Sequence, residues 1–451
     1  MARIFLFFGL LFACAGVAYG QHYQWRHTLP VSCRSVGFNP LSKGRIIFAG
    51  PDQNTNGVFR SDDGGTTWTL HNTDTLSKPL NNVHQVFCIP SDTNIVLAVT
   101  PNQLYRSTDG GISWKMVDSL GGVDGEDIAW HEIGDIVYYG QNFGYALWKS
   151  SDHGATWYQT GFANTDSIGL CALDVSQDTV PTIIQGSDGA GLLARTTDDG
   201  NHWSVTLRAD TGTNNQTEVP KVVFSKYATD QATGRHDVAL AIRWLSTYRS
   251  LVATTNGGLD WITLNSPSTY PWALDVDQRA SMLSKSGDFP LHFFIGLFGL
   301  RTDTIQHGMV QETTDGGESW HSINFPILAD TNAHYVWVLK YDTTSGRIAV
   351  ATDSGIYIAD SGTSIVEEGA PQLAADLLIT AHAGSLEVVA PHQILSASLY
   401  DMLGRVIRQV QPSDNGIRRF SMQTNGFSPG AYALEVIMTG LAPALRMLML
   451  P

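Results

Sequence analysis

The sequence predicts an all-β protein: a seven-bladed β-propeller followed by a small C-terminal β-sandwich. Three observations lead to this prediction. Glycine accounts for 44 of the 451 residues, and charged residues for only 15%, against about 25% in an average soluble protein. The apolar content of 43% is enough to build a core, so the low charge does not indicate disorder. A short motif that ends in tryptophan also recurs along the chain at intervals of one propeller blade.

The chain is acidic, with 42 aspartates and glutamates against 27 lysines and arginines, which gives a formal net charge of −15. A nucleic-acid binder needs a basic face that displaces counterions from phosphates, and docking on an anionic membrane surface also requires basic residues. The composition therefore argues against both kinds of partner.

The first 20 residues are typical of a secretion signal. Arg3 supplies the basic start, residues 4–17 form the apolar segment, and Ala18-Tyr19-Gly20 forms a small-x-small cleavage site. The apolar segment is too short to span about 30 Å of hydrocarbon, and no other stretch is long and apolar enough. In an alternative interpretation, Cys14 is a lipid-attachment site. The remaining cysteines, which we expect to be buried free thiols, are Cys33, Cys88 and Cys171.

The repeated motif reads Ser/Thr-x-Asp-x-Gly-x-x-Trp and lies between two short strand patterns. Its acidic position is occupied by Asp63, Asp109, Asp152, Asp198, Asn256 and Asp315, and its last position by Trp68, Trp114, Trp157, Trp203, Trp261 and Trp320. This pattern predicts a hairpin turn in which the aspartate accepts hydrogen bonds from backbone N–H groups. The glycine supplies a positive φ, and the tryptophan packs beneath the turn.

The motifs resemble the Asp boxes of sialidase-like β-propellers, also called BNR repeats, and the resemblance extends from about residue 22 to residue 362. It implies that the box aspartates are structural elements at the periphery of the propeller rather than catalytic groups.

Each repeat is expected to form one four-stranded blade. The second repeat, for example, has strand patterns at 83–89, 95–100, 103–107 and 114–117. The last repeat has only three, at 334–341, 347–352 and 355–359. Trp25 falls in register with the motif tryptophans, so residues 23–29 are predicted to supply the missing strand and close the ring. Seven blades follow, with six or eight as alternatives because the fifth and sixth repeats carry long insertions.

The C-terminal part is predicted to be a separate unit. Residues 363–376 are small and polar and form a linker, while residues 377–451 show strand patterns without the turn motif. This last segment resembles the C-terminal sorting domain of the type IX secretion system. The matching residues are Leu399, Tyr400, Asp401, Gly404, Arg405, Gly430 and Tyr432; Phe427 and the terminal Pro451 depart from the pattern.

The sorting resemblance implies export through the type IX machinery and a secreted or outer-membrane-attached protein. The alternative is a plain sandwich domain for adhesion or carbohydrate binding. The expected organisation is thus a signal peptide at 1–20, a propeller at 21–362, a linker, and a sorting domain at 377–451.

Ligands of such propellers usually bind at the face opposite the Asp boxes, as the resemblance implies. We expect candidate residues at the starts of the inner strands and in the loops of that face, where aromatic rings can stack on sugars. These candidates are His84, Glu126, Asp127, Lys221, Trp244, Tyr248, Tyr270, Trp272, His334 and Tyr335. The alternative is that many of these rings only seal contacts between blades and loops.

The motifs of several enzymes are missing. The arginine segment that marks sialidases is absent, and Glu126 and Asp127 are adjacent, so on a regular strand they would not form the carboxyl pair that glycosidases use. Xyloglucanase-like relatives place their cleft between two propellers, whereas this chain predicts one. Asp52, Asn54 and Asn56 form a weak calcium-loop pattern, and no cofactor motif is found.

The sequence therefore favours a secreted, non-catalytic propeller that binds an extracellular glycan or protein. A glycoside hydrolase acting on extracellular polysaccharide is the second hypothesis. A factor that assists assembly of another complex is the third.

Overall fold

The computed structural model shows an all-β chain. It describes residues 23–52, 54–72, 80–101, 103–117, 125–142, 146–162, 170–188, 191–208, 217–226, 228, 234–245, 249–266, 270–278, 292–299, 310–323, 325, 334–361, 378–382, 385–389, 394–400, 406–410, 419–424, 430–438 and 444–450. The predicted signal segment lies outside these residues. Within them, no helix has the length and apolar character that crossing a bilayer requires.

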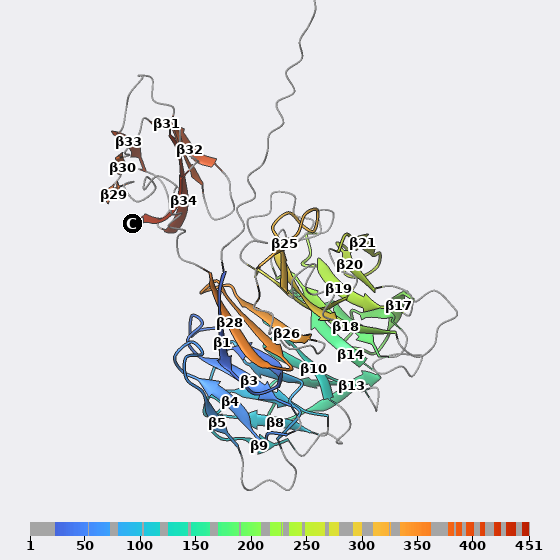
Figure 1. Ribbon diagram of the computed structural model, residues 1–451. Helices are drawn as coiled ribbons and strands as arrows, with labels where there is room; N and C mark the ends of the chain where they lie inside the picture. The colour runs from blue at the N-terminus through green and yellow to red at the C-terminus, as the bar shows by residue number, and fades with distance from the viewer. Residues whose placement is uncertain are drawn as a thin grey trace, which may run out of the picture.

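Seven blades surround a central channel, as the sequence predicted (Figure 1). The first is β2 (Cys33–Phe38), β3 (Ile47–Pro51), β4 (Val58–Ser61) and β5 (Thr69–His71). The second is β6 (Gln85–Cys88), β7 (Val96–Val99), β8 (Leu104–Ser107) and β9 (Lys115–Met116). The third is β10 (Gly125–His131), β11 (Ile136–Gln141), β12 (Ala146–Ser150) and β13 (Tyr158–Phe162).

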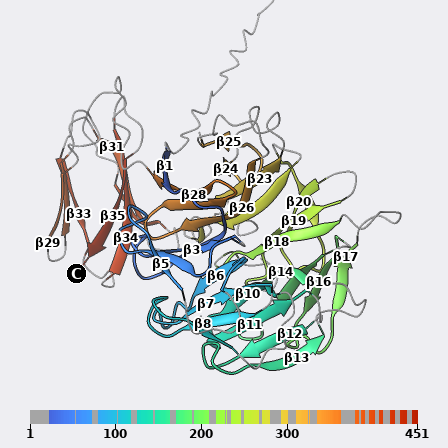
Figure 2. The same ribbon diagram turned by 60° about the horizontal axis from the view of Figure 1, so that its bottom comes forward.

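The next three blades follow the same antiparallel order. The fourth is β14 (Leu170–Val175), β15 (Ile183–Ser187), β16 (Leu193–Thr196) and β17 (Ser204–Leu207). The fifth is β18 (Glu218–Phe224), β19 (Ala239–Trp244), β20 (Arg249–Thr254) and β21 (Ile262–Leu264). The sixth is β22 (Pro271–Val276), β23 (Phe293–Gly299), β24 (Val310–Thr313) and β25 (His321–Ser322). Figure 2 shows inner strands such as β10, β14 and β18 toward the channel and β13 and β17 at the rim.

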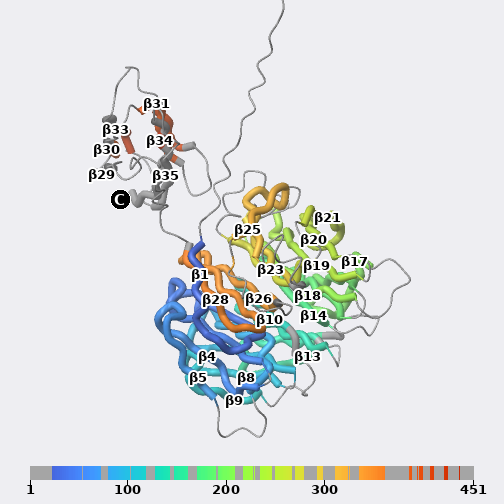
Figure 3. The backbone as a smooth tube through the Cα atoms, in the orientation of Figure 1, coloured from blue at the N-terminus to red at the C-terminus, as the bar shows by residue number. Residues whose placement is uncertain are grey.

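The seventh blade joins the two ends of the propeller. It contains β26 (His334–Asp342), β27 (Arg347–Thr352), β28 (Gly355–Ser361) and the N-terminal strand β1 (Tyr23–Leu29). β1 pairs with β28 in antiparallel register, with Trp25 opposite Ala359, and the two strands run side by side in Figure 3. The inner strands β26 and β2 are in contact, which completes the ring. The predicted closure by one N-terminal strand is therefore confirmed.

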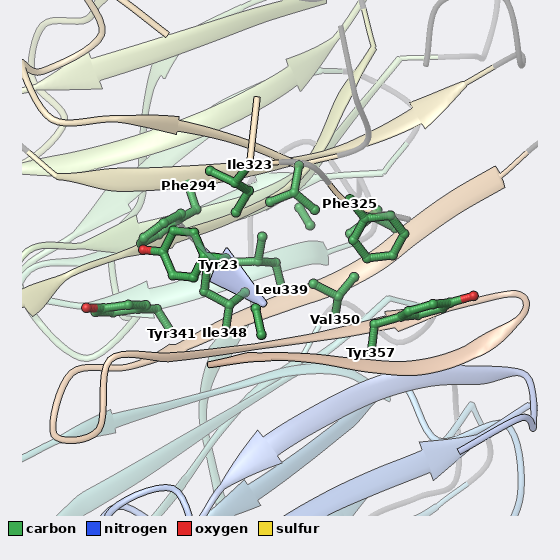
Figure 4. Packing of buried hydrophobic residues seen from close by; sticks show 13 residues of the cluster. Tyr23, Phe294, Ile323, Phe325, Leu339, Tyr341, Ile348, Val350 and Tyr357 are labelled. Atoms are coloured by element: carbon green, nitrogen blue, oxygen red, sulfur yellow. The ribbon is translucent and has the colours of Figure 1, made fainter. Parts of the chain in front are cut away.

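The core lies between neighbouring blades rather than at the centre of the ring. Between blades 6 and 7, Tyr23 of the closing strand packs with Phe294, Tyr341 and Val350 (Figure 4). The ring of Tyr23 meets that of Phe294 edge-on, with centroids 6.3 Å apart. Each blade thus buries the apolar face of its neighbour. The edges of the innermost strands, with their polar backbone groups, face the channel.

The repeated turn motif shows the same hydrogen bonds in successive blades. In the first blade, Ser61 Oγ donates to Asp63 Oδ1 at 2.8 Å, and the N–H of Gly65 donates to Ser61 Oγ at 2.8 Å. The N–H and hydroxyl of Thr67 donate to the two oxygens of Asp63. Donation from Thr67 lowers the pKa of the Asp63 carboxyl to about 2. These aspartates are therefore fully engaged in their own turns.

The C-terminal segment forms two sheets. One contains β29 (Leu378–His382), β30 (Ser385–Val389) and β33 (Arg419–Gln423). The other contains β31 (Ile394–Tyr400), β32 (Val406–Val410), β34 (Gly430–Met438) and β35 (Ala444–Leu450). Leu399 pairs with Leu434, and Tyr432 pairs with Leu448, so the two segments named from the sequence share one sheet with the last strand. Asp401, Gly404 and Arg405 lie outside the described residues.

Candidate functional site at the channel mouth

The inner strands share an irregularity near their starts. In six of the seven blades the register with the second strand shifts there, which leaves an extra residue in the inner strand. The extra positions fall at Arg34, Glu126, Cys171, Val219-Pro220, Trp272 and Trp337. Such β-bulges re-aim side chains and are common beside functional sites.

Most of the bulge residues line a cavity at one end of the channel. The cavity has a volume of about 120 Å³, and we call this region the channel mouth, defined by Arg34, His84, Cys171, Pro220, Trp272 and Trp337 among its lining residues. Inner strands start at this end, whereas the turn motifs follow the ends of the third strands. Because the strands are antiparallel, the mouth and the turn motifs lie on opposite faces of the propeller.

A series of aromatic rings lies at the mouth, and Trp272 and Trp337 of this series line the cavity. We call the series the aromatic arc; its members are Tyr270, Trp244, Trp272, Trp337 and Tyr335. The ring centroids of Trp244 and Trp272 are 4.8 Å apart, and those of Trp272 and Trp337 are 6.1 Å apart, both edge to face. Trp337 also lies 5.3 Å from Tyr335. The arc therefore spans the inner ends of blades 5, 6 and 7.

Two arginines flank the arc. The guanidinium carbon of Arg249 lies 4.2 Å from the ring centroid of Trp244 and 4.3 Å from that of Tyr270. The guanidinium carbon of Arg34, on the first blade, lies 4.6 Å above Trp337. Cation–π attraction holds both side chains beside the rings.

Within the channel, carboxylates connect the inner strands of adjacent blades. Asp127 Oδ2 accepts a hydrogen bond from the N–H of Leu173, and Asp174 Oδ2 accepts one from Phe224 at 2.7 Å. Asp275 Oδ2 likewise accepts from Tyr341 at 2.7 Å. These aspartates satisfy inner-strand amides that have no partner in their own sheet.

A lysine crosses the channel among these acids. Lys221 Nζ lies 3.0 Å from Asp127 Oδ2, and both side chains are mostly buried. Burial alone would lower the pKa of Lys221, but the charge and hydrogen bond of Asp127, with the charges of Asp174 and Asp275, raise it. Burial raises the pKa of the Asp174 carboxyl to about 6, against the opposing effect of its backbone hydrogen bonds. The one ammonium group of Lys221 thus lies among three carboxyl groups and pairs directly with Asp127.

The structure brings most of the sequence candidates together. His84, Asp127, Lys221 and Trp272 line the cavity at the mouth. Trp244, Tyr270 and Tyr335 belong to the aromatic arc. Glu126 lies on β10 and His334 on β26, but their side chains are not among those described, and Tyr248 lies outside the described residues. The register shift falls at Glu126, so regular alternation does not hold between Glu126 and Asp127.

Three residues of the mouth were not among the ligand residues predicted from the sequence. Arg34 and Trp337 were absent from the candidate ligand residues, because their placement depends on bulges and on contact between the first and last blades. Cys171 was expected to be buried, and this was wrong: it is partly exposed and lines the cavity, whereas Cys33 and Cys88 are buried. Cys171 lies at the register shift between Leu170 and Ala172.

The calcium-loop residues make local hydrogen bonds. Asp52 Oδ2 accepts from Ser32 Oγ at 3.4 Å, and Asn56 Oδ1 accepts from the N–H of Leu80 at 2.8 Å. Among the described residues, no group of three or more histidine, cysteine or acidic side chains is placed to hold a metal ion.

The chain has sequence similarity to a xyloglucanase from Paenibacillus sp., with 23% identity over 361 residues. The match covers 75% of this chain and 32% of the xyloglucanase, so this chain spans about a third of that relative's length. No model of a protein family matches the chain.

Two solved structures have the same fold. YCF48 from Cyanidioschyzon merolae is 13% identical with a TM-score of 0.52, covering 74% of this chain and 98% of that one. A YCF48 bound to D1 peptide is 14% identical with a TM-score of 0.52, covering 76% and 96%. The protein is therefore a seven-bladed β-propeller, similar in fold to YCF48 and in sequence to part of a xyloglucanase.

Proposed function

We propose that the protein is a glycan-binding propeller and that the channel mouth is its binding face. The observation that carries this proposal is the aromatic arc, because adjacent tryptophan faces and edges at a hollow surface are suited to stacking on sugar rings. The sequence similarity to a xyloglucanase supports a polysaccharide ligand over a nucleic acid or lipid.

Titration calorimetry of the full chain with xyloglucan, galactan and pectin oligosaccharides tests this proposal. Burying an aromatic side chain stabilises by about 1.5–3 kcal/mol, so Trp272→Ala or Trp337→Ala should weaken binding about tenfold or more. Tyr158→Ala is the matched control, because that ring is 49% exposed on the outer strand β13. Undiminished binding by both tryptophan variants would place the ligand elsewhere.

Hydrolysis of a polysaccharide is the second candidate, and the xyloglucanase similarity favours it. A glycosidase needs one protonated and one ionised carboxyl on either side of the scissile bond. Asp127, Asp174 and Asp275 instead accept hydrogen bonds from inner-strand amides, which fits a structural role better. Release of reducing sugar that is abolished by Glu126→Gln or Asp127→Asn would establish hydrolysis and contradict the binding-only proposal.

We also propose that the repeated turns are Asp boxes and that residues 1–20 and 377–451 direct export and type IX sorting to the cell surface. Support comes from the repeated hydrogen bonds of the turns and from the pairing of β31, β34 and β35. Deleting residues 377–451 should retain the protein in the periplasm. Normal surface delivery of the truncated chain would refute the sorting proposal.

A further inference from the structure

We infer that the glycan bound at the channel mouth is a carboxylated one, a polysaccharide of uronic acids. This inference rests on the proposed function and deepens it by naming the ligand class. It starts from the two arginines that contact the aromatic arc, for which the described residues provide no acidic partner.

Arg249 is held between two rings. Because Trp244 and Tyr270 cover the faces of its guanidinium at 4.2 and 4.3 Å, only the edge of the group remains for hydrogen bonds. Its Nε atom is buried and has no hydrogen-bond partner within the described part of the chain. A buried donor without an acceptor is costly, so an acceptor supplied by a ligand would be favourable.

Arg34 stands at the other end of the arc. It lines the mouth cavity, and its guanidinium lies over Trp337 at 4.6 Å. Over the described ranges, no carboxylate oxygen lies within ion-pair distance of Arg34 or Arg249. By contrast, Lys221 is paired with Asp127. The described residues thus leave two arginines of this face without an acidic partner, although the chain has a net charge of −15.

A uronic acid polysaccharide matches this arrangement. Each of its units presents a ring that can stack on the aromatic arc and a planar carboxylate that the edge of a guanidinium binds with two parallel hydrogen bonds. A neutral glycan would also use the rings, but its hydroxyl groups would offer Arg249 only uncharged acceptors, which make weaker hydrogen bonds than a carboxylate. The arginines at both ends of the arc would then fix the register of a chain that crosses it.

The test compares oligomers of polygalacturonate with the same oligomers fully methyl-esterified, which lack the negative charge and carry one added methyl group on each unit. Titration calorimetry with the full chain should give at least about tenfold tighter binding of the acid form, the factor expected for a hydrogen-bonded charged group. Arg249→Gln and Arg34→Gln should each reduce this ratio toward one. Lys115→Gln, at an exposed residue of β9, removes the same charge and should keep the ratio.

Arg249→Lys tests whether misfolding causes a lost preference for the acid form. It keeps the positive charge but lacks the planar guanidinium that binds a carboxylate with two hydrogen bonds. It should lose most of the preference for the acid form while its melting temperature stays that of the unmodified chain. Equal affinity for the acid and the ester overturns this inference and leaves the proposed function standing. Binding of no glycan at all overturns both.

Two further ligands test whether the site prefers a carboxylated glycan to other anions. Dextran sulfate that binds as tightly as polygalacturonate would show that charge alone is recognised and would overturn the assignment of a carboxylate. An acidic peptide that outcompetes polygalacturonate would overturn the assignment of a glycan.

Discussion

The Nζ atom of Lys221 on β18 lies 3.0 Å from Oδ2 of Asp127 on β10, so an ion pair joins blade 5 to blade 3 across the channel. The same oxygen of Asp127 accepts a hydrogen bond from the N–H of Leu173 in the intervening blade. Asp127 therefore connects three blades, and the charge of Lys221 compensates for its burial.

Replacing Lys221 with methionine should destabilise the propeller by about 1–3 kcal/mol, because it leaves the Asp127 carboxylate without its cationic partner. Denaturant unfolding of Lys221→Met, Asp127→Asn and the double variant measures the coupling. The double variant should cost less than the sum of the single ones. Strict additivity would contradict a direct interaction between these side chains.

The pH dependence of stability should reflect His292. Its Nδ1 lies 3.0 Å from Asp277 and its Nε2 2.7 Å from Glu312. Burial alone would lower its pKa, but these two acids raise it to about 8. An unfolded histidine titrates near 6.5, so the stabilisation is complete below that pH and is lost as the pH rises through about 8.

Unfolding free energies at pH 6 and pH 9 test this relation. The unmodified chain should lose about 2 kcal/mol between the two values. His292→Gln should remove most of that difference, while the control His202→Gln, at a side chain that is 90% exposed, should retain it. A histidine NMR titration that placed the pKa of His292 below 6.5 would refute the prediction.

Closure of the ring depends on Trp25. Its Nε1 donates to the carbonyl of Ile323 at 2.7 Å, and its ring meets that of Phe325 at 4.8 Å. Trp25→Ala should therefore cost about 2–4 kcal/mol, somewhat less than for a fully buried tryptophan. Tyr158→Ala should change stability by no more than about 0.5 kcal/mol. Equal effects of the two substitutions in guanidinium unfolding would argue against closure by β1.

Substitution of the glycine in the turn motif should destabilise the protein. Gly111 has a φ of +88°, and a Cβ there would lie 2.7 Å from Cε1 of Phe48 in the preceding blade. Gly111→Ala should cost about 1–2 kcal/mol for the backbone and a further 1–3 kcal/mol for the collision. Gly316 has a φ of +76° with no atom within 4 Å of a built Cβ, so Gly316→Ala should show the backbone cost alone. Similar melting temperatures for the two variants would contradict the packing contact.

The blades and their closure could be predicted because the information is local. The turn chemistry around Asp63 is contained in eight consecutive residues, and Trp25 could be placed by its register with later tryptophans. The closing pair of Trp25 and Ala359 then followed from the missing strand of the last blade.

The mouth could be predicted only in part. Lys221 and Trp272 lie near the starts of inner strands and were found. Trp337 was missed because a register shift between Val336 and Val338 decides where it points, and that shift depends on pairing with β27. Arg34 reaches Trp337 only because the first and last blades meet, a contact between distant parts of the sequence.

Oxidative footprinting of the tryptophans, with and without polygalacturonate oligomers, tests the central claim most directly. Trp272 and Trp337 should be protected by the ligand, while Trp68 and Trp320 of the turn motifs, on the opposite face, should react as before. Protection of Trp68 and Trp320 with no change at Trp272 and Trp337 would contradict a binding site at the channel mouth.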